Sequence, residues 1–105
     1  MKKFITAALI TIICSLFSLG ATAGVVAQTN NVIGLMGVDS TSGVIYVAVS
    51  GYSGGSCSQI RFNNANADTD KILSVLTAAK LAGKRVRIDL ADGADCNSGW
   101  RAYIQ

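Results

Sequence analysis

Apolar and polar residues alternate in several short runs of this chain, which is the period of a β-strand. The run 44–50 is apolar on both faces, as in a strand that is covered on both sides. The run 84–90 alternates charged with apolar side chains, as in a strand with one exposed face. The pattern therefore predicts five strands, at residues 32–38, 44–50, 57–63, 84–90 and 100–104.

One segment between the third and fourth strands has a helical period instead. Its apolar residues fall at positions i, i+3, i+4 and i+7 and form a single stripe, which consists of Ile72, Val75, Leu76 and Ala79. Asp68 suits the N-cap of this helix, and Gly83 suits the position just beyond its last turn. We therefore expect one helix at about residues 68–82.

The expected order of elements is β-β-β-α-β-β, in a single domain at residues 32–105. A mainly β, α+β domain with this order resembles the OB-fold, a five-stranded antiparallel barrel that often binds oligosaccharides or oligonucleotides. Residues 24–31 are mostly small and polar, so we expect a flexible leader before the domain.

The first 23 residues have the three parts of a bacterial secretory signal, in the required order. Lys2 and Lys3 precede an uncharged apolar stretch at residues 4–19, and Ala21-Thr22-Ala23 is a small-x-small cleavage site. We expect cleavage after Ala23, with Ala27 as the alternative, and export to the periplasm or beyond the cell. The apolar stretch is shorter than the ~20 residues that span a membrane, so we expect no membrane span after cleavage.

Removal of the signal would change both the net charge and the cysteine count. The full chain has a net charge of +3, whereas residues 24–105 hold seven basic and six acidic side chains, and thus a net charge of +1. This balance excludes the strongly basic class of nucleic-acid-binding proteins. Cys57 and Cys96 are the two cysteines that remain, and an oxidising compartment favours a disulfide between them.

Few side chains of this sequence are suited to catalysis. The chain has no histidine, and its six acidic residues are all aspartates, so neither a thiol nor a hydroxyl has its usual activating base. A cluster at the fourth strand and the following turn offers oxygen ligands for calcium, but its spacing does not match an EF-hand; it consists of Asp89, Asp92, Asp95 and Asn97. We expect a solvated turn there, and a non-enzymatic protein without a metal or cofactor.

Several motifs resemble the secreted B subunits of subtilase cytotoxin and its pertussis-like relatives. These motifs are Tyr46-Val47-Ala48-Val49-Ser50-Gly51, a glycine-serine loop into Cys57-Ser58, the amphipathic helix, and Gly83-Lys84-Arg85-Val86-Arg87-Ile88. The resemblance covers about residues 44–96 and implies an OB-fold subunit of a glycan-binding pentamer. The sugar-contacting serine and acidic residues of that family have no counterpart here, so its glycan specificity does not carry over. A separate family of small secreted bacterial proteins that shares only the fold would have the same features.

Aromatic, hydroxyl and guanidinium side chains are the candidates for ligand binding, because saccharides are held by a flat ring and a few polar groups. Tyr52 lies on a glycine-serine loop, whereas Tyr46 and Trp100 suit the core or an interface. Arg101 would extend a basic stripe if the last two strands pair. The candidates are Tyr52, Ser53, Ser56, Arg85, Arg87 and Tyr103. We expect an exported glycan-binding module; the alternative is a small periplasmic protein of structural or inhibitory role that binds another protein through a strand edge.

Overall fold

The computed structural model describes residues 24–39 and 43–105. The expected signal segment at residues 1–23, with its cleavage site after Ala23, lies outside the described residues, as does the middle of the turn at residues 40–42. Within the described part of the chain, no helix is both long enough and apolar enough to cross a membrane.

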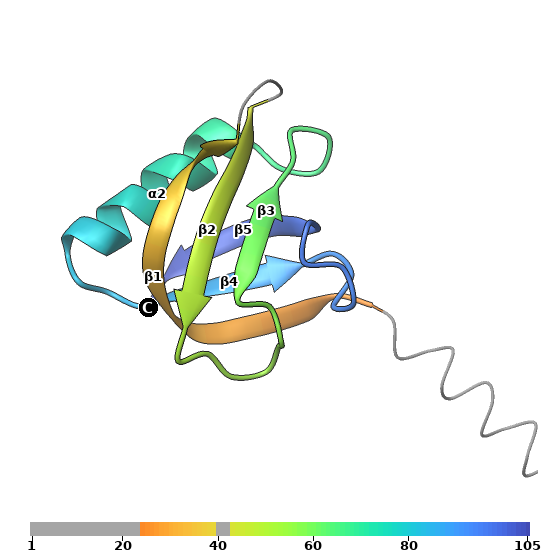
Figure 1. Ribbon diagram of the computed structural model, residues 1–105, viewed down its shortest axis with the longest axis horizontal. Helices are drawn as coiled ribbons and strands as arrows, with labels where there is room; N and C mark the ends of the chain where they lie inside the picture. The colour runs from red at the N-terminus through yellow and green to blue at the C-terminus, as the bar shows by residue number, and fades with distance from the viewer. Residues whose placement is uncertain (1–23, 40–42) are drawn as a thin grey trace, which may run out of the picture.

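Five strands and one helix follow one another in the predicted order β-β-β-α-β-β (Figure 1). Four strands and the helix lie within two residues of their expected bounds, and only the first strand differs by more. The elements are β1 (Val26–Asp39), β2 (Val44–Ser50), β3 (Gln59–Phe62), α2 (Thr69–Leu81), β4 (Val86–Leu90) and β5 (Gly99–Ile104).

The five strands form one mixed sheet that closes in a ring, in the order β1-β2-β3-β5-β4. Every neighbouring pair is antiparallel except β3 and β5, which are parallel and meet at Phe62 and Gly99. The expectation of a wholly antiparallel sheet is therefore wrong at this pair. A side chain at Gly99 would not fit there, because its Cβ would lie 2.8 Å from the Phe62 ring.

Strand β1 is longer than predicted, because residues 26–31, which were expected to form a flexible leader, are its first half. This half pairs with β4, and the second half pairs with β2. The register shifts between Gln28 and Asn31, and Asn30 between them has a φ of 60°. Strand β1 thus changes its partner along its length, from β4 to β2. Its first half lacks an apolar alternation because Gln28 and Asn31 are polar and yet fully buried.

Helix α2 has the predicted caps and the predicted buried face. The Asp68 carboxylate accepts a hydrogen bond from the Lys71 backbone N–H at 3.3 Å, and Gly83 has a φ of 65° just beyond the last turn. Ile72, Leu76 and Ala79 are buried. They join a core built from the inward side chains of the strands, which are Ile45, Val47, Val49, Ile60, Phe62, Val86, Ile88 and Leu90.

Candidate functional site

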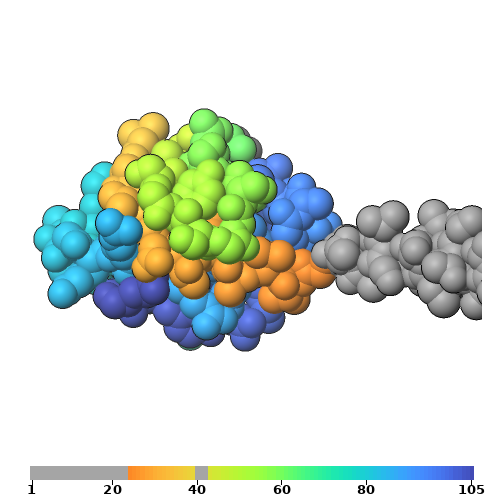
Figure 2. All heavy atoms as spheres, turned by 90° about the horizontal axis from the view of Figure 1, so that it is seen from below, coloured from red at the N-terminus to blue at the C-terminus, as the bar shows by residue number. Residues whose placement is uncertain are grey.

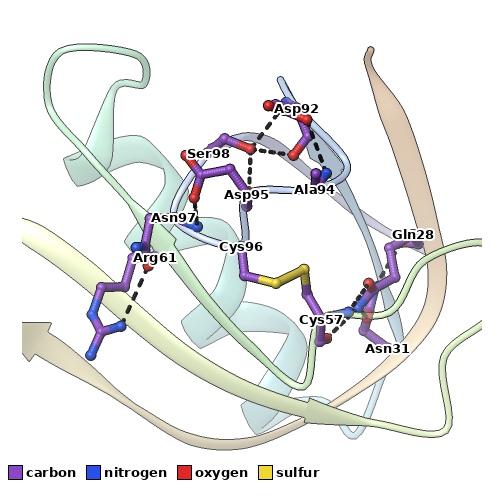
Figure 3. Close-up of a disulfide and its surroundings, with 10 residues drawn as sticks. All are labelled: Gln28, Asn31, Cys57, Arg61, Asp92, Ala94, Asp95, Cys96, Asn97 and Ser98. Carbon is purple, nitrogen blue, oxygen red and sulfur yellow. Dashed lines mark hydrogen bonds between the residues drawn. A yellow bond between two sulfur atoms is a disulfide. The ribbon is translucent and has the colours of Figure 1, made fainter. Parts of the chain in front are cut away.

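The disulfide between Cys57 and Cys96 joins two loops of the ring and confirms the predicted pair. Cys57 lies in the loop between β2 and β3, and Cys96 lies in the turn between β4 and β5; their Cα atoms are 5.6 Å apart (Figure 3). The Cys96 carbonyl also accepts a hydrogen bond from the Arg61 backbone N–H at 3.0 Å. The turn that holds Cys96 is thereby joined both to the loop before β3 and to β3 itself.

Two buried amide side chains hold the Cys57 loop from the other side (Figure 3). Gln28 Nε2 donates to the Cys57 carbonyl at 2.8 Å, and Gln28 Oε1 accepts from the Cys57 backbone N–H at 3.0 Å. Asn31 accepts from Gln28 Nε2 at 2.6 Å and donates to the Val86 carbonyl at 2.9 Å. These contacts give buried polar groups hydrogen-bond partners beside the register shift of β1, as buried polar groups require.

The turn between β4 and β5 uses its own polar groups to fix its shape. Asp92 Oδ1 accepts from the Ala94 backbone N–H at 2.9 Å, and Asp95 Oδ1 accepts from Asn97 in the same way. The Ser98 hydroxyl lies 2.8 Å from the Asp92 carbonyl oxygen. Among the described residues, no group of three or more histidine, cysteine or acidic side chains could hold a metal ion. The aspartates here are therefore turn-forming groups.

Strands β4 and β5 do pair, and they bring together two of the three arginines of the expected basic stripe. Arg87 and Arg101 each form an ion pair with Asp89, at 2.9 and 3.1 Å, and only 1% of the Asp89 side chain is exposed. The hydrogen bond and the charge of Asp89 raise the pKa of Arg87 above its ordinary value. The guanidinium groups lie over aromatic rings, Arg87 over Tyr103 and Arg101 over Trp100. This face is therefore largely self-paired.

A depression of about 350 Å³ lies on the outer face of β1, β2 and β3. We call it the outer-face depression. Its polar residues are Asp39, Tyr46 and Arg61. Gly37 has no side chain and therefore leaves space within the depression. Its lining consists of Leu35, Met36, Gly37, Val38, Asp39, Tyr46 and Arg61.

Strand register places three of these residues side by side across the sheet. Gly37 is the partner of Tyr46 on the neighbouring strand, and Tyr46 is the partner of Arg61 on the next. We call them the Gly37–Tyr46–Arg61 row. Residues directly opposite each other share one face of a sheet, and the buried Ile45 and Val47 beside Tyr46 show that this is the outer face. A Cβ added to Gly37 would have no atom within 4 Å.

The Arg61 side chain contacts three residues, Asp39, Tyr46 and Asn97. Its Nε lies 3.1 Å from Asp39 Oδ2, its guanidinium carbon lies 5.1 Å from the centre of the Tyr46 ring, and its Nη1 donates to Asn97 at 3.4 Å (Figure 3). The Arg61 side chain is 41% exposed and that of Asp39 is 47% exposed. The site thus presents a ring, a donor fork and a carboxylate to solvent in a fixed arrangement.

The residues predicted as a ligand site do not form one group. Tyr52 is half-buried against the core, and Ser53 forms a pair of 2.9 Å backbone hydrogen bonds with Thr29, so this part of the loop is anchored. Ser56 is exposed. Arg87 and Tyr103 do meet, whereas Arg85 lines a different depression, beside the end of α2. No hydrogen bond, ion pair or ring contact in the described ranges joins Tyr52 to Arg87 or Tyr103.

Sequence reasoning placed Tyr46 in the core or an interface and did not select Gly37 or Arg61. Tyr46 lies in a strand that is apolar throughout, so its outward face has no polar signal. The available signal was the alternation of β3, in which Arg61 points away from Ile60 and Phe62.

Comparison of the chain with protein-family models, curated proteins and solved structures finds no match.

Proposed function

We propose that this chain is an exported, non-catalytic binding module with an OB-like barrel, and that the outer-face depression holds its ligand. The order of strands around the ring and the helix between β3 and β4 support the OB-like assignment. OB-folds bind their ligands on the face of the second and third strands and through the adjoining loops. The outer-face depression occupies the corresponding part of this sheet.

The Gly37–Tyr46–Arg61 row is the observation that carries this proposal. A half-exposed ring beside a position without a side chain leaves room for the apolar face of a sugar to stack. Arg61 supplies donors for hydroxyl groups, and Asp39 supplies an acceptor. Arg61 is already fixed by Asp39 and Tyr46, so little side-chain entropy is lost on binding.

A saccharide fits this surface better than a nucleic acid. The one cation of the depression is paired with Asp39 at 3.1 Å, so the surface has no excess positive charge. A nucleic acid needs several unpaired cations along its phosphates. Export by the signal at residues 1–23 is part of the proposal. A ring of subunits, which the resemblance implies, stays a prediction.

Binding to a glycan array tests the proposal. We expect the wild-type protein to bind a set of saccharides and Tyr46→Ala to lose that binding while keeping its fold, as judged by circular dichroism. Tyr103→Ala is the matched control, because Tyr103 is an exposed tyrosine on β5, outside the outer-face depression. Equal binding by Tyr46→Ala and wild type would exclude this site.

A protein ligand for the same surface is the second candidate. One large apolar side chain of the depression is exposed, Leu35 at 73%. Exposed apolar groups beside polar ones are typical of protein-binding surfaces. A wild-type protein that gives no array signal, but captures one protein partner that Leu35→Ser does not capture, would favour this candidate over the saccharide.

A further inference from the structure

The basic side chains of this domain fall into two groups. Seven are present among the described residues. Four form ion pairs with aspartates, namely Arg61, Lys71, Arg87 and Arg101. The other three, Lys80, Lys84 and Arg85, have no carboxylate within ion-pairing distance in the described part of the chain. Among the described residues, the basic side chains without an ion pair are therefore these three.

All three unpaired cations line one depression of about 290 Å³, which we call the basic depression. Val32, Ile33 and Gly83 complete its lining, and no acidic residue contributes. It lies where the end of α2 meets the middle of β1; Figure 2 shows this side of the molecule, with the cyan end of the helix beside the orange and gold residues of the strand. The basic depression shares no lining residue with the outer-face depression.

Hydrogen bonds to or from the backbone hold the Lys80 ammonium group and the main chain of Lys84 and Arg85. Lys80 Nζ donates to the Gly34 carbonyl at 2.7 Å, which holds its ammonium group over β1. The Lys84 backbone N–H donates to the Ala79 carbonyl at 2.9 Å and closes the helix end. The Arg85 carbonyl accepts from the Gln105 backbone N–H, also at 2.9 Å. The three cations thus project from the end of a helix and the start of a β-ladder, which are firm supports for a site.

We propose that the basic depression binds a phosphate or sulfate group, that is, a tetrahedral oxyanion with up to two negative charges. An arginine fork can bind two oxygens of such a group at once, and lysines add point charges. Val32, which is exposed, offers an apolar contact to the carbon skeleton that carries the oxyanion. Cations at a helix C-terminus also offset its partial negative charge. Arg85, however, lies four residues beyond α2, outside the range of that effect.

Titration with inorganic phosphate tests this proposal directly. In ¹H–¹⁵N spectra at fixed ionic strength, we expect saturable shifts of the amides of Val32, Gly83, Lys84 and Arg85. Lys84→Gln and Arg85→Gln should each weaken binding about tenfold, because each removes one charge-assisted contact. Lys71→Gln is the matched control, since Lys71 lies at the other end of the same helix and is paired with Asp68. It should bind phosphate like the wild type.

Further probes identify the source of the group. Inorganic sulfate should shift the same amides, and acetate, which carries one charge, should bind more weakly. Glycerol phosphate represents a soluble ligand, and vesicles of phosphatidylcholine with phosphatidic acid represent a lipid headgroup; competition by either for these amides supports the proposal and assigns the source. Equal affinities of acetate and phosphate, shifts without saturation, or unchanged binding by Lys84→Gln and Arg85→Gln would overturn it. Gly37→Val, which alters only the outer-face depression, should leave phosphate binding unchanged, so this inference and the proposed function can fail separately.

Discussion

Asp89 is a fully buried carboxylate on the outer face of a sheet, a position that is normally exposed. Its burial follows from its neighbours. Arg87 precedes it by two residues on the same strand, and Arg101 is its partner on β5, so both guanidinium groups reach the carboxylate and their carbon chains cover it. The alternation of β4 predicted which face Asp89 occupies. Its burial depends on strand pairing, which the alternation does not contain.

Replacement of Asp89 by asparagine should destabilise the fold. The change removes two ion pairs, so we expect a loss of about 1–3 kcal/mol in the free energy of unfolding. The loss should not be larger, because both arginines can turn towards water. Arg85→Met is the control, because Arg85 has no carboxylate partner in the described ranges, and its stability should stay close to that of the wild type. Urea denaturation measures both. A loss no larger for Asp89→Asn than for Arg85→Met would contradict the structural importance of this cluster.

Gln28 provides a second prediction at the scale of one side chain. Gln28→Met keeps the side-chain volume but leaves the Cys57 backbone N–H and carbonyl without the partners they have now. Unsatisfied buried groups of this kind cost about 1–3 kcal/mol each, so we expect a substantial decrease in the urea midpoint. Gln59→Met, at an exposed glutamine of β3, should have little effect. Similar midpoints for the two variants would show that the amide contacts contribute nothing.

At the scale of elements, the local pattern was sufficient wherever a segment has at least one apolar face. Helix α2 and strands β2 to β5 were predicted on this basis. The first half of β1 was missed because its buried side chains are amides that bond to the Cys57 loop and to β4, and no periodicity marks such residues. The parallel pair of β3 and β5 was missed because it depends on how α2 and β4 return the chain to the far side of the ring.

Two glycine substitutions separate backbone conformation from packing at this scale. Gly83→Ala places a Cβ in open space but at a φ of 65°, so we expect a loss of about 1–2 kcal/mol from the left-handed conformation alone. Gly37→Ala also adds a methyl group in open space, but its φ lies outside the left-handed region. It should leave stability unchanged or raise it slightly. Thermal unfolding checks the pair, and equal effects would contradict the conformational explanation.

At the scale of the whole molecule, the candidate site depends on the pairing of three successive strands. Gly37, Tyr46 and Arg61 become neighbours only through the registers of β1 with β2 and of β2 with β3. The sequence contains both alternations, but the registers are set by turns and by the core. The disulfide was predictable, because the choice was limited to two cysteines after the expected signal.

The disulfide should contribute strongly to stability in a domain of this size. Its cysteines are 39 residues apart, and the loop-closure entropy that it removes from the unfolded chain corresponds to about 4 kcal/mol. We therefore expect the Cys57→Ala/Cys96→Ala double variant to unfold at a much lower urea concentration than the oxidised protein. The reduced wild type should resemble the double variant. A double variant as stable as the oxidised protein would contradict this expectation.

Glycan-array binding by Gly37→Val tests most directly whether the outer-face depression binds a saccharide. Valine suits a β-strand and would fill the space beside Tyr46 without straining the backbone, so the melting temperature should not fall. The folded variant should lose the saccharide binding of the wild type, whereas Tyr52→Ala should retain it. Unchanged binding by Gly37→Val, or an array on which the wild type binds no saccharide, would contradict saccharide binding at this depression.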